Sequence, residues 1–350
     1  MLGFAEILRV HAEKYPLMTP QDYCKLAFQS EFGPEHMVTD VQQAAGGILS
    51  EWQAIPPDTP PRPPEPIGNG LCRFYLTSEY DPEEAAPLLA ELFVRTAGER
   101  TGTIHGLNTR FESLRRLDVP GMDAYLDEYL LHGCPVEHHS AVFRKNYKPH
   151  YRLLKWDYAR WFPVLLAVRR LMSSGRKPAV IAIDGRCGSG KTTLAEQLER
   201  LFPCNIFHMD DFYLPMAKRA PDWESIPAGN MDLSRFSQEV LEPVKRGETA
   251  EYIKFDCQTG KGADPVRAPP RPLAVVEGSY CLHPSLAGGY GLKIFLTCSK
   301  AEQERRLRGR EGDYFSAFQA RWIPMEERYF SVLGISDSCD MVIDTGETYF

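Results

Sequence analysis

Long hydrophobic runs are missing from this chain of 350 residues. A membrane-spanning helix needs roughly 18 consecutive apolar residues, and the longest apolar run, residues 162–168, is far shorter. Glu6 and Arg9 interrupt the first ten residues, where the apolar core of a secretion signal would have to lie. We therefore expect a cytoplasmic protein with no membrane partner.

Paired cysteines are missing as well. The nine cysteines are scattered, their number is odd, and no two follow the C-x-x-C spacing. This pattern excludes a disulfide scaffold and gives no support to a standard zinc site. We interpret the cysteines as free thiols, most of them buried.

An excess of positive charge is also missing, because 40 Lys and Arg residues stand against 47 Asp and Glu residues, which gives a net charge of −7. Such a chain has no general attraction to nucleic acids or anionic lipids. Residues 143–155 are a local exception, since basic and aromatic side chains alternate there. That segment fits either a groove for single-stranded nucleic acid or a half-buried surface segment, and the net charge argues against nucleic acid.

The length predicts about two domains, and a short polar segment at 173–178 separates two kinds of sequence. Residues 1–172 predict a mostly helical domain. Its stretch 56–66 holds seven prolines and predicts an extended surface loop, because proline fixes φ and lacks the N–H donor. Residues 177–350 predict an α/β domain. The helices expected in the first domain lie at 1–14, 19–28, 85–97, 123–131 and 157–172.

The second domain contains five short apolar runs rich in β-branched residues. Such runs are typical of strands that are covered on both faces. Helical stretches lie between most of them, and strands that alternate with helices indicate a parallel sheet. The expected strands lie at 179–184, 205–208, 273–276, 292–296 and 341–343.

Residues 185–192, GRCGSGKT, fit the pattern G-x-x-x-x-G-K-[ST]. They follow the first expected strand and open a helical pattern at Lys191, which is the context that a phosphate-binding loop (P-loop) requires. Glycines let the backbone approach a phosphate closely, and the N–H groups of the loop and helix start attract negative charge. The predicted nucleotide-binding residues are Gly185, Arg186, Cys187, Gly188, Ser189, Gly190, Lys191, Thr192 and Thr193.

Lys191 would reach the β- and γ-phosphates of a nucleotide, and the Thr192 hydroxyl would bind Mg²⁺. Asp210 and Asp211 follow the second expected strand. Carboxylates at the carboxyl end of a parallel strand point into the crevice where open α/β sheets bind ligands. A GTPase is not indicated, because the N-K-x-D motif that reads guanine is absent.

The second domain resembles the uridine kinase and phosphoribulokinase family of P-loop kinases. Beside the P-loop, the resemblance rests on HMDDFY at 208, NMD at 230, FDCQTG at 255, VVEG at 275, an Arg-rich stretch at 305–310 and VIDT at 342. It implies ATP and Mg²⁺ as cofactors. It also implies that Asp210 is the base at the acceptor hydroxyl and that Glu277 holds Mg²⁺ with Thr192 and Asp210.

The same resemblance implies residues for the acceptor and for a lid. Tyr213 and Asp211 would line the acceptor pocket, and Asp232 would bind hydroxyls of a ribose-like acceptor. Arg305 and Arg306 would belong to a catalytic lid over the phosphates, although they also fit a solvated charged helix face.

Two positions depart from the family pattern. Gly260, followed by Lys261, stands where uridine kinases carry a histidine, and Glu302 stands where an arginine is expected. The sequence thus predicts a kinase that phosphorylates a hydroxyl of a small molecule. That acceptor is a nucleoside or, alternatively, a sugar phosphate whose charge Lys261 would meet.

Three matters stay open at this stage. A non-catalytic ATP sensor that signals through the first domain is the alternative from another functional class. A homo-oligomer is compatible with the sequence. In residues 1–172, metal-ligating residue types occur without the spacing of a standard zinc set, at Glu35, His36, His132, Cys134, Glu137, His138 and His139.

Overall fold

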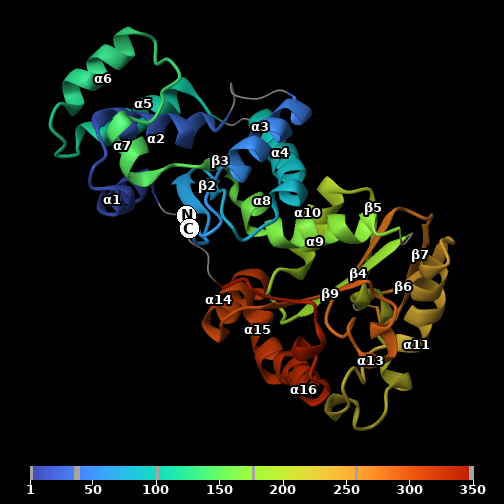
Figure 1. The fold of residues 1–350 in the computed structure, drawn as a ribbon. Coiled ribbons are helices and arrows are strands. Elements are labelled where there is room, and N and C mark those ends of the chain that lie inside the picture. The colour runs from blue at the N-terminus through green and yellow to red at the C-terminus, as the bar shows by residue number, and fades with distance from the viewer. Residues whose placement is uncertain (1–2, 35–39, 100–101, 176–177, 257–258, 347–350) are drawn as a thin grey trace. The chain divides into compact units, whose positions relative to one another are not determined.

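The computed structural model describes residues 3–34, 40–99, 102–175, 178–256 and 259–346. The chain forms two compact units that divide after Phe162 (Figure 1). The sequence placed the boundary after residue 172, whereas helix α9 (Phe162–Ser173) falls almost wholly in the second unit. None of the helices in the described residues is long and apolar enough to cross a membrane.

The first unit is mostly helical, as predicted, but it also contains a small sheet that the sequence reasoning missed. Its helices are α1 (Phe4–Lys14), α2 (Pro20–Phe32), α3 (Val41–Gln53), α4 (Pro82–Gly98), α5 (Ile104–Arg115), α6 (Met122–Leu131), α7 (Ala141–Tyr147) and α8 (Trp156–Arg160). The antiparallel sheet has the order β1 (Glu65–Gly68), β2 (Leu71–Tyr75) and β3 (Tyr151–Lys155).

Local signals explain how the elements of the first unit begin and turn. Thr19 and Asp22 form a capping box at the start of α2, which satisfies backbone donors that a helix start leaves unpaired. Asn69 and Gly70 both have positive φ and connect β1 to β2, as the Asn-Gly pair does in tight hairpins. The Pro-rich stretch is a loop up to residue 64, and its last residues, Glu65 and Pro66, belong to β1.

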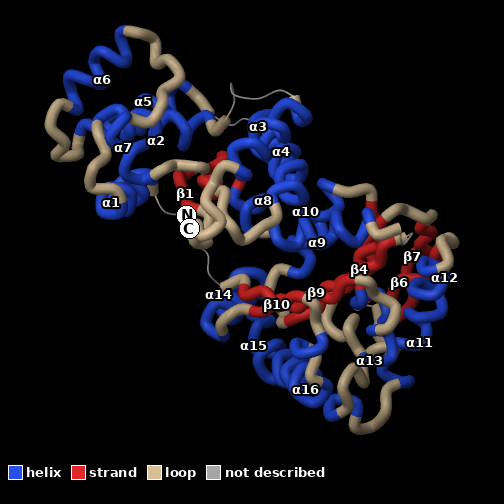
Figure 2. Tube along the Cα trace, viewed as in Figure 1, coloured by secondary structure: helices blue, strands red, loops and turns tan. Residues whose placement is uncertain are grey.

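The second unit is built on a five-stranded parallel sheet in the order β10-β9-β4-β8-β5 (Figure 2). This confirms the predicted α/β fold with its five strands. The strands are β4 (Ala179–Gly185), β5 (Cys204–His208), β8 (Leu273–Glu277), β9 (Leu292–Thr297) and β10 (Met341–Asp344). Because all five run in parallel, their carboxyl ends meet at one edge, where ligands bind in sheets of this class.

Helices and one hairpin complete the second unit. The longer helices besides α9 are α10 (Lys191–Leu201), α14 (Lys300–Glu311) and α16 (Ile323–Leu333). The short ones are α11 (Leu233–Phe236), α12 (Glu242–Lys245), α13 (Pro284–Ala287) and α15 (Phe315–Ala317). The sequence reasoning missed the antiparallel hairpin β6 (Ala250–Asp256) and β7 (Lys261–Ala268).

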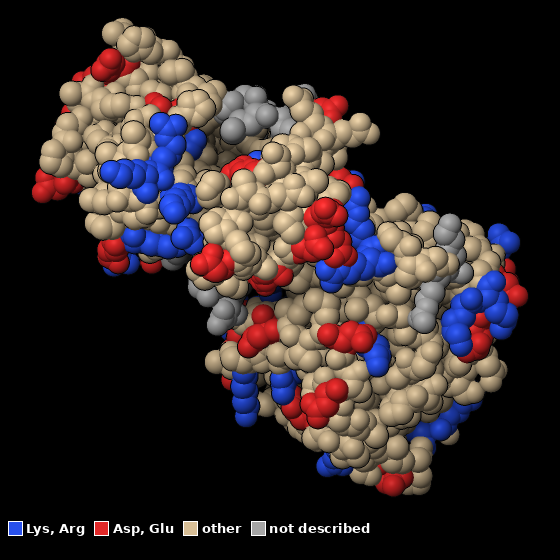
Figure 3. All heavy atoms as spheres, in the orientation of Figure 1, with Lys and Arg blue, Asp and Glu red and all other residues tan. Residues whose placement is uncertain are grey.

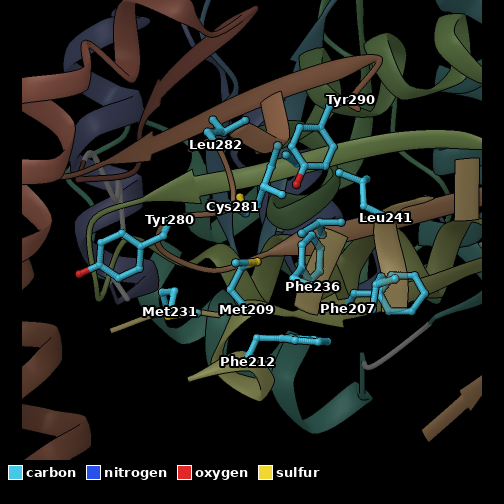
Figure 4. Close-up of a cluster of buried hydrophobic side chains, with 14 of the residues drawn as sticks. Phe207, Met209, Phe212, Met231, Phe236, Leu241, Tyr280, Cys281, Leu282 and Tyr290 are labelled. Carbon is cyan, nitrogen blue, oxygen red and sulfur yellow. The ribbon is translucent and has the colours of Figure 1, made fainter. Parts of the chain in front are cut away.

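A buried hydrophobic cluster fixes the segment that follows β5 (Figure 4). Met209 and Phe212 are fully buried in this cluster, and the ring of Phe212 meets that of Phe236 edge-on at 5.1 Å between centroids. Such core packing leaves little freedom to the backbone between the two residues. The core therefore determines the position of Asp210 and Asp211, which lie between them.

Candidate active site at the carboxyl edge of the parallel sheet

The loop after β4 approaches the neighbouring strand so closely that its first position requires glycine. Gly185 has a φ of 137°, and a Cβ there would lie 1.9 Å from the carbonyl oxygen of Leu296 in β9. Gly188 and Gly190 also have positive φ, 76° and 94°. The loop thus folds tightly against the sheet and leads into α10.

Five backbone N–H groups of this loop and the helix start have no acceptor among the described residues. They belong to Gly188, Gly190, Lys191, Thr192 and Thr193. The last three belong to the first turn of α10, where a helix cannot satisfy its own donors. Unpaired N–H groups at a helix start form an anion site. These N–H groups are therefore available to an anion, and their binding of a phosphate chain stays a prediction of the motif.

Lys191 reaches back over the loop. Its ammonium group donates to the carbonyl of Gly185 at 2.6 Å and lies 3.3 Å from the hydroxyl of Ser279. Burial alone would lower the pKa of Lys191, but the negative charges of Glu326, Asp184 and Glu277 raise it. The side chain is therefore a cation at the mouth of the loop.

Glu277 ends β8 and joins the loop to β5. Its Oε1 accepts from the Thr192 hydroxyl at 3.3 Å and lies 2.5 Å from Nδ1 of His208. The hydrogen bond to Glu277 raises the pKa of His208. Thr192 and Glu277, both expected to bind Mg²⁺, thus lie together, and their oxygen atoms are ligands of the type that Mg²⁺ prefers. Sequence reasoning did not identify His208 as part of this site.

Asp210 lies at the same sheet edge. Its side chain is open to solvent and accepts a hydrogen bond of 3.0 Å from the Tyr213 hydroxyl. Partial desolvation by the surrounding protein and the negative charge of Glu277 raise the pKa of Asp210, while Tyr213 and Lys191 oppose the rise. Because β5 lies beside β8 and β8 beside β4, the segment that carries Asp210 and the P-loop follow strands of the same sheet edge.

The other expected acceptor residues are distributed unevenly. Asp232 begins α11 and its N–H donates to the carbonyl of Phe212, so it lies beside the Asp210–Tyr213 segment. Asp211 is buried, with its carboxylate toward the Tyr252 hydroxyl at 3.2 Å. Lys261 is exposed at the start of β7, and among the described residues no hydrogen bond or ion pair joins it to the rest of the site.

Arg305 and Arg306 lie on α14 and both bond to Glu302. Arg305 is exposed and contacts no P-loop atom through any described hydrogen bond. Arg306 also donates to the carbonyl of Gly188 at 3.1 Å and to the carbonyl of Thr345 at 2.6 Å. Arg306 thus fastens the loop to the end of β10, and a lid role for either arginine stays a prediction.

The remaining loop side chains, those of Arg186, Cys187 and Ser189, lie against the fold or inside it. The Arg186 guanidinium donates to Glu327 and Thr297. Only the backbone of Arg186 therefore contributes to the phosphate-binding loop. The Cys187 thiol is buried, and burial raises its pKa, so its thiolate form is disfavoured. Ser189 is also fully buried.

Glu326 in α16 is a site residue that sequence reasoning missed. Its carboxylate accepts from the Cys187 N–H at 2.9 Å and from the Ser279 hydroxyl at 2.5 Å. It also interacts electrostatically with Lys191. More than 130 residues separate Glu326 from the loop in sequence, and it lies in no motif, so only the fold reveals it.

The described metal-ligating residue types of the first unit bond to other side chains and do not gather around one point. His139 bonds to Asp22 and Tyr151, and Glu137 accepts from Tyr125. Within the described residues, no group of three His, Cys, Asp or Glu side chains is placed to hold a metal ion. Glu35 and His36 lie outside the described residues.

Comparison with known proteins finds solved structures of kinases that are similar to about half of this chain at low sequence identity. No protein-family model matches the chain. A possible uridine kinase from Bacillus stearothermophilus is 20% identical with a TM-score of 0.40, and covers 51% of this chain and 100% of its own. The putative fructose transport system kinase from Silicibacter sp. TM1040 is 22% identical (TM-score 0.37; 51% and 95%). The D-glycerate 3-kinase from Cryptococcus neoformans is 17% identical (TM-score 0.39; 53% and 95%).

Proposed function

We propose that the second unit is an ATP-dependent kinase that transfers the γ-phosphoryl group to a hydroxyl of a small metabolite. The observation that supports the proposal most is that Asp210, which follows β5, and the P-loop with its unpaired N–H groups, which follows β4, lie at the carboxyl edge of one parallel sheet. An anion site alone would serve a sensor equally well. A solvent-accessible carboxylate beside it gives an acceptor hydroxyl a place for its proton.

The residues of the site support an in-line transfer. The acceptor oxygen forms a bond to the γ-phosphorus while the bond from that phosphorus to the β–γ bridging oxygen breaks, and ADP leaves. Asp210 accepts the hydroxyl proton, and its raised pKa brings it closer to the range of an effective base. Lys191 and the loop N–H groups balance the negative charge of the phosphates.

The donor set suits a magnesium ion. Thr192, Glu277 and Asp210 supply a hydroxyl and two carboxylates, and Mg²⁺ is commonly held by one or two carboxylates together with substrate phosphates. When bound, the ion would neutralise phosphate charge and orient the triphosphate. His208 positions Glu277 through their hydrogen bond.

The acceptor proposed first is a nucleoside. Tyr213 offers an aromatic face. Asp232, whose backbone bonds to the Asp210–Tyr213 segment and whose Oδ1 accepts from the Arg235 N–H, offers a carboxylate. This combination suits a ribose with several hydroxyl donors. A sugar phosphate is the alternative acceptor. Lys254, 3.5 Å from Asp211, and Lys261 are the cations of the β6–β7 hairpin that would meet its charge.

The test is ADP release by the full chain with Mg·ATP and a panel of nucleosides, free sugars and sugar phosphates. We expect one class to raise the rate of ADP release well above the rate without acceptor, with one phosphorylated product per ADP. Tight ATP binding without stimulation by any acceptor would contradict the kinase and favour the ATP sensor.

A further inference from the structure

The first unit contains a concave pocket that the proposed kinase reaction does not use. Its volume is about 620 Å³, within the range of roughly 300–1,000 Å³ that is usual for small-molecule sites. Helices α2, α3 and α7 and strand β3 contribute to its lining, and all of them belong to the first unit. The lining residues that matter here are Lys25, Gln29, Phe93, Arg144, Tyr151 and Leu153.

A network of hydrogen-bonded side chains fixes one wall of this pocket. The Asp22 carboxylate accepts from Nδ1 of His139, and Nε2 of His139 accepts from the Tyr151 hydroxyl at 2.7 Å. This direction follows because the Asp22 carboxylate can only accept, which places the ring proton on Nδ1. Burial lowers the pKa of His139 to about 4, so the ring is neutral and Nε2 is an acceptor. Gln29 in turn donates to the Tyr151 oxygen at 3.1 Å. Buried networks with every member satisfied fix side chains in place.

Lys25 is the buried charged residue of this pocket. Only 9% of its surface is exposed. Its ammonium group donates one hydrogen bond, 2.7 Å long, to the carbonyl of Glu137. An ammonium group has three donors, so two remain for a ligand in the pocket that Lys25 lines.

The pocket carries more positive than negative charge. Arg152 is neutralised by Glu51 at 2.7 Å, but neither Lys25 nor Arg144 forms an ion pair within the described part of the chain. Figure 3 shows Lys and Arg side chains gathered on the face of the first unit where α7 lies. Arg144, on α7, is exposed and lines the pocket. Two unpaired cations, one buried and one exposed, therefore line the same pocket.

Apolar groups complete the lining, because Phe93 and Leu153 are buried side chains of the pocket wall. A ligand that satisfies both kinds of surface has an anionic group and an apolar body. We propose that this pocket binds a small organic phosphate monoester, with Lys25 and Arg144 as ligands of its phosphate and Phe93 and Leu153 against its body. Two unpaired cations favour the doubly charged phosphate over a carboxylate.

The proposal is tested with phenyl phosphate, titrated calorimetrically into the full chain in saturating Mg·ADP to occupy the P-loop. We expect one site, with at least tenfold weaker binding of benzoate. Arg144→Glu should weaken phenyl phosphate binding at least tenfold, because an exposed ligand becomes repulsive. Lys145→Glu is the matched control, since Lys145 follows Arg144 on α7, is exposed and does not line the pocket. The affinity of the Lys145→Glu variant for phenyl phosphate should stay within twofold of the wild type.

Lys25→Met tests the buried ligand and should abolish the site while the far-ultraviolet circular dichroism stays unchanged. If that variant does not fold, the Arg144 and Lys145 pair decides alone. Absence of binding at millimolar phenyl phosphate, or equal losses in Arg144→Glu and Lys145→Glu, would overturn the proposal. Tighter binding of benzoate than of phenyl phosphate would overturn the choice of a phosphate.

Discussion

The polar groups around Arg73 in the first unit and those at the sheet edge of the second unit are paired in different ways. In the first unit, fully buried Arg73 bonds to Glu65 and Gln29, and the polar groups around it pair mostly with one another. In the second, unpaired N–H groups and a solvent-accessible carboxylate meet at a sheet edge. A buried polar group costs free energy unless it is paired, so the pairing around Arg73 maintains the fold of the first unit. The unpaired donors at the sheet edge, like those of Lys25 in the pocket, indicate a ligand.

The largest expected effect concerns chemistry in the second unit. Lys191→Ala and Asp210→Asn should each lower kcat by about two to four orders of magnitude, the usual span for an electrostatic or general-base group. Asp211→Asn is the matched control for Asp210→Asn. It changes the adjacent carboxylate, which faces Tyr252, so its kcat should fall far less. Turnover of the acceptor identified by the panel is the measurement. Full kcat in Asp210→Asn would remove Asp210 from the mechanism.

Sequence patterns predicted the second unit better than the first for a physical reason. Parallel strands covered on both faces are continuous apolar runs, so β4 and β8 stand out in the sequence, and the P-loop is a contiguous motif. Strand β2 reads LCRFY and places Arg73 inside the fold, which no apolar pattern predicts. Its charge is tolerated only because Glu65 lies beside it in the adjacent strand.

The residues of the candidate site likewise include some that the sequence predicts and some that it does not. Lys191, Thr192 and Asp210 could be predicted because they lie in motifs next to predicted strands. Glu326 could not, since its role depends on where α16 packs against the loop. Asp211 illustrates the reverse limit: the motif includes it, but the side chain turns toward Tyr252 because its backbone lies between two core residues, Met209 and Phe212.

The next effect is on acid stability, where the two units should separate. Burial lowers the pKa of His11 and of His139 to about 4, from an ordinary value of 6.5. Below pH 6.5 these histidines therefore bind protons in the unfolded chain but not in the folded unit. The free energy of unfolding falls as the pH is lowered to about 4. Each histidine contributes a loss on the order of 3 kcal/mol.

Hydrogen–deuterium exchange at a series of pH values measures this loss in each unit separately. Amides of α1 and α2 should lose protection between pH 6.5 and 4 more steeply than those of β4. His139→Gln should flatten that dependence, and His132→Gln, at an exposed position, serves as control. Equal acid sensitivity of the two units would contradict the comparison.

A smaller effect is expected from the backbone of the P-loop. Gly185→Ala introduces a Cβ that would lie 1.9 Å from a carbonyl oxygen of β9, whereas a Cβ at Gly190 meets nothing within 4 Å. Both substitutions share the strain of positive φ, about 1–2 kcal/mol, but only Gly185→Ala must also move a strand. We expect it to lower the free energy of unfolding by about 2 kcal/mol more than Gly190→Ala, measured by urea titration. Equal values would show that the loop does not depend on its approach to β9.

The smallest effect has the opposite pH dependence to that of the first unit. The hydrogen bond to Glu277 raises the pKa of His208, so the pair stabilises the second unit fully below pH 6.5 and loses that contribution as pH rises through the raised pKa. The pair is partly exposed, so its contribution is at most about 1 kcal/mol. His208→Gln should remove this dependence from the exchange of β5 and β8 amides while leaving α1 and α2 unchanged. If acidification lowered the amide protection of β5 as it lowers that of α1, the expected opposite pH dependence of the two units would be wrong.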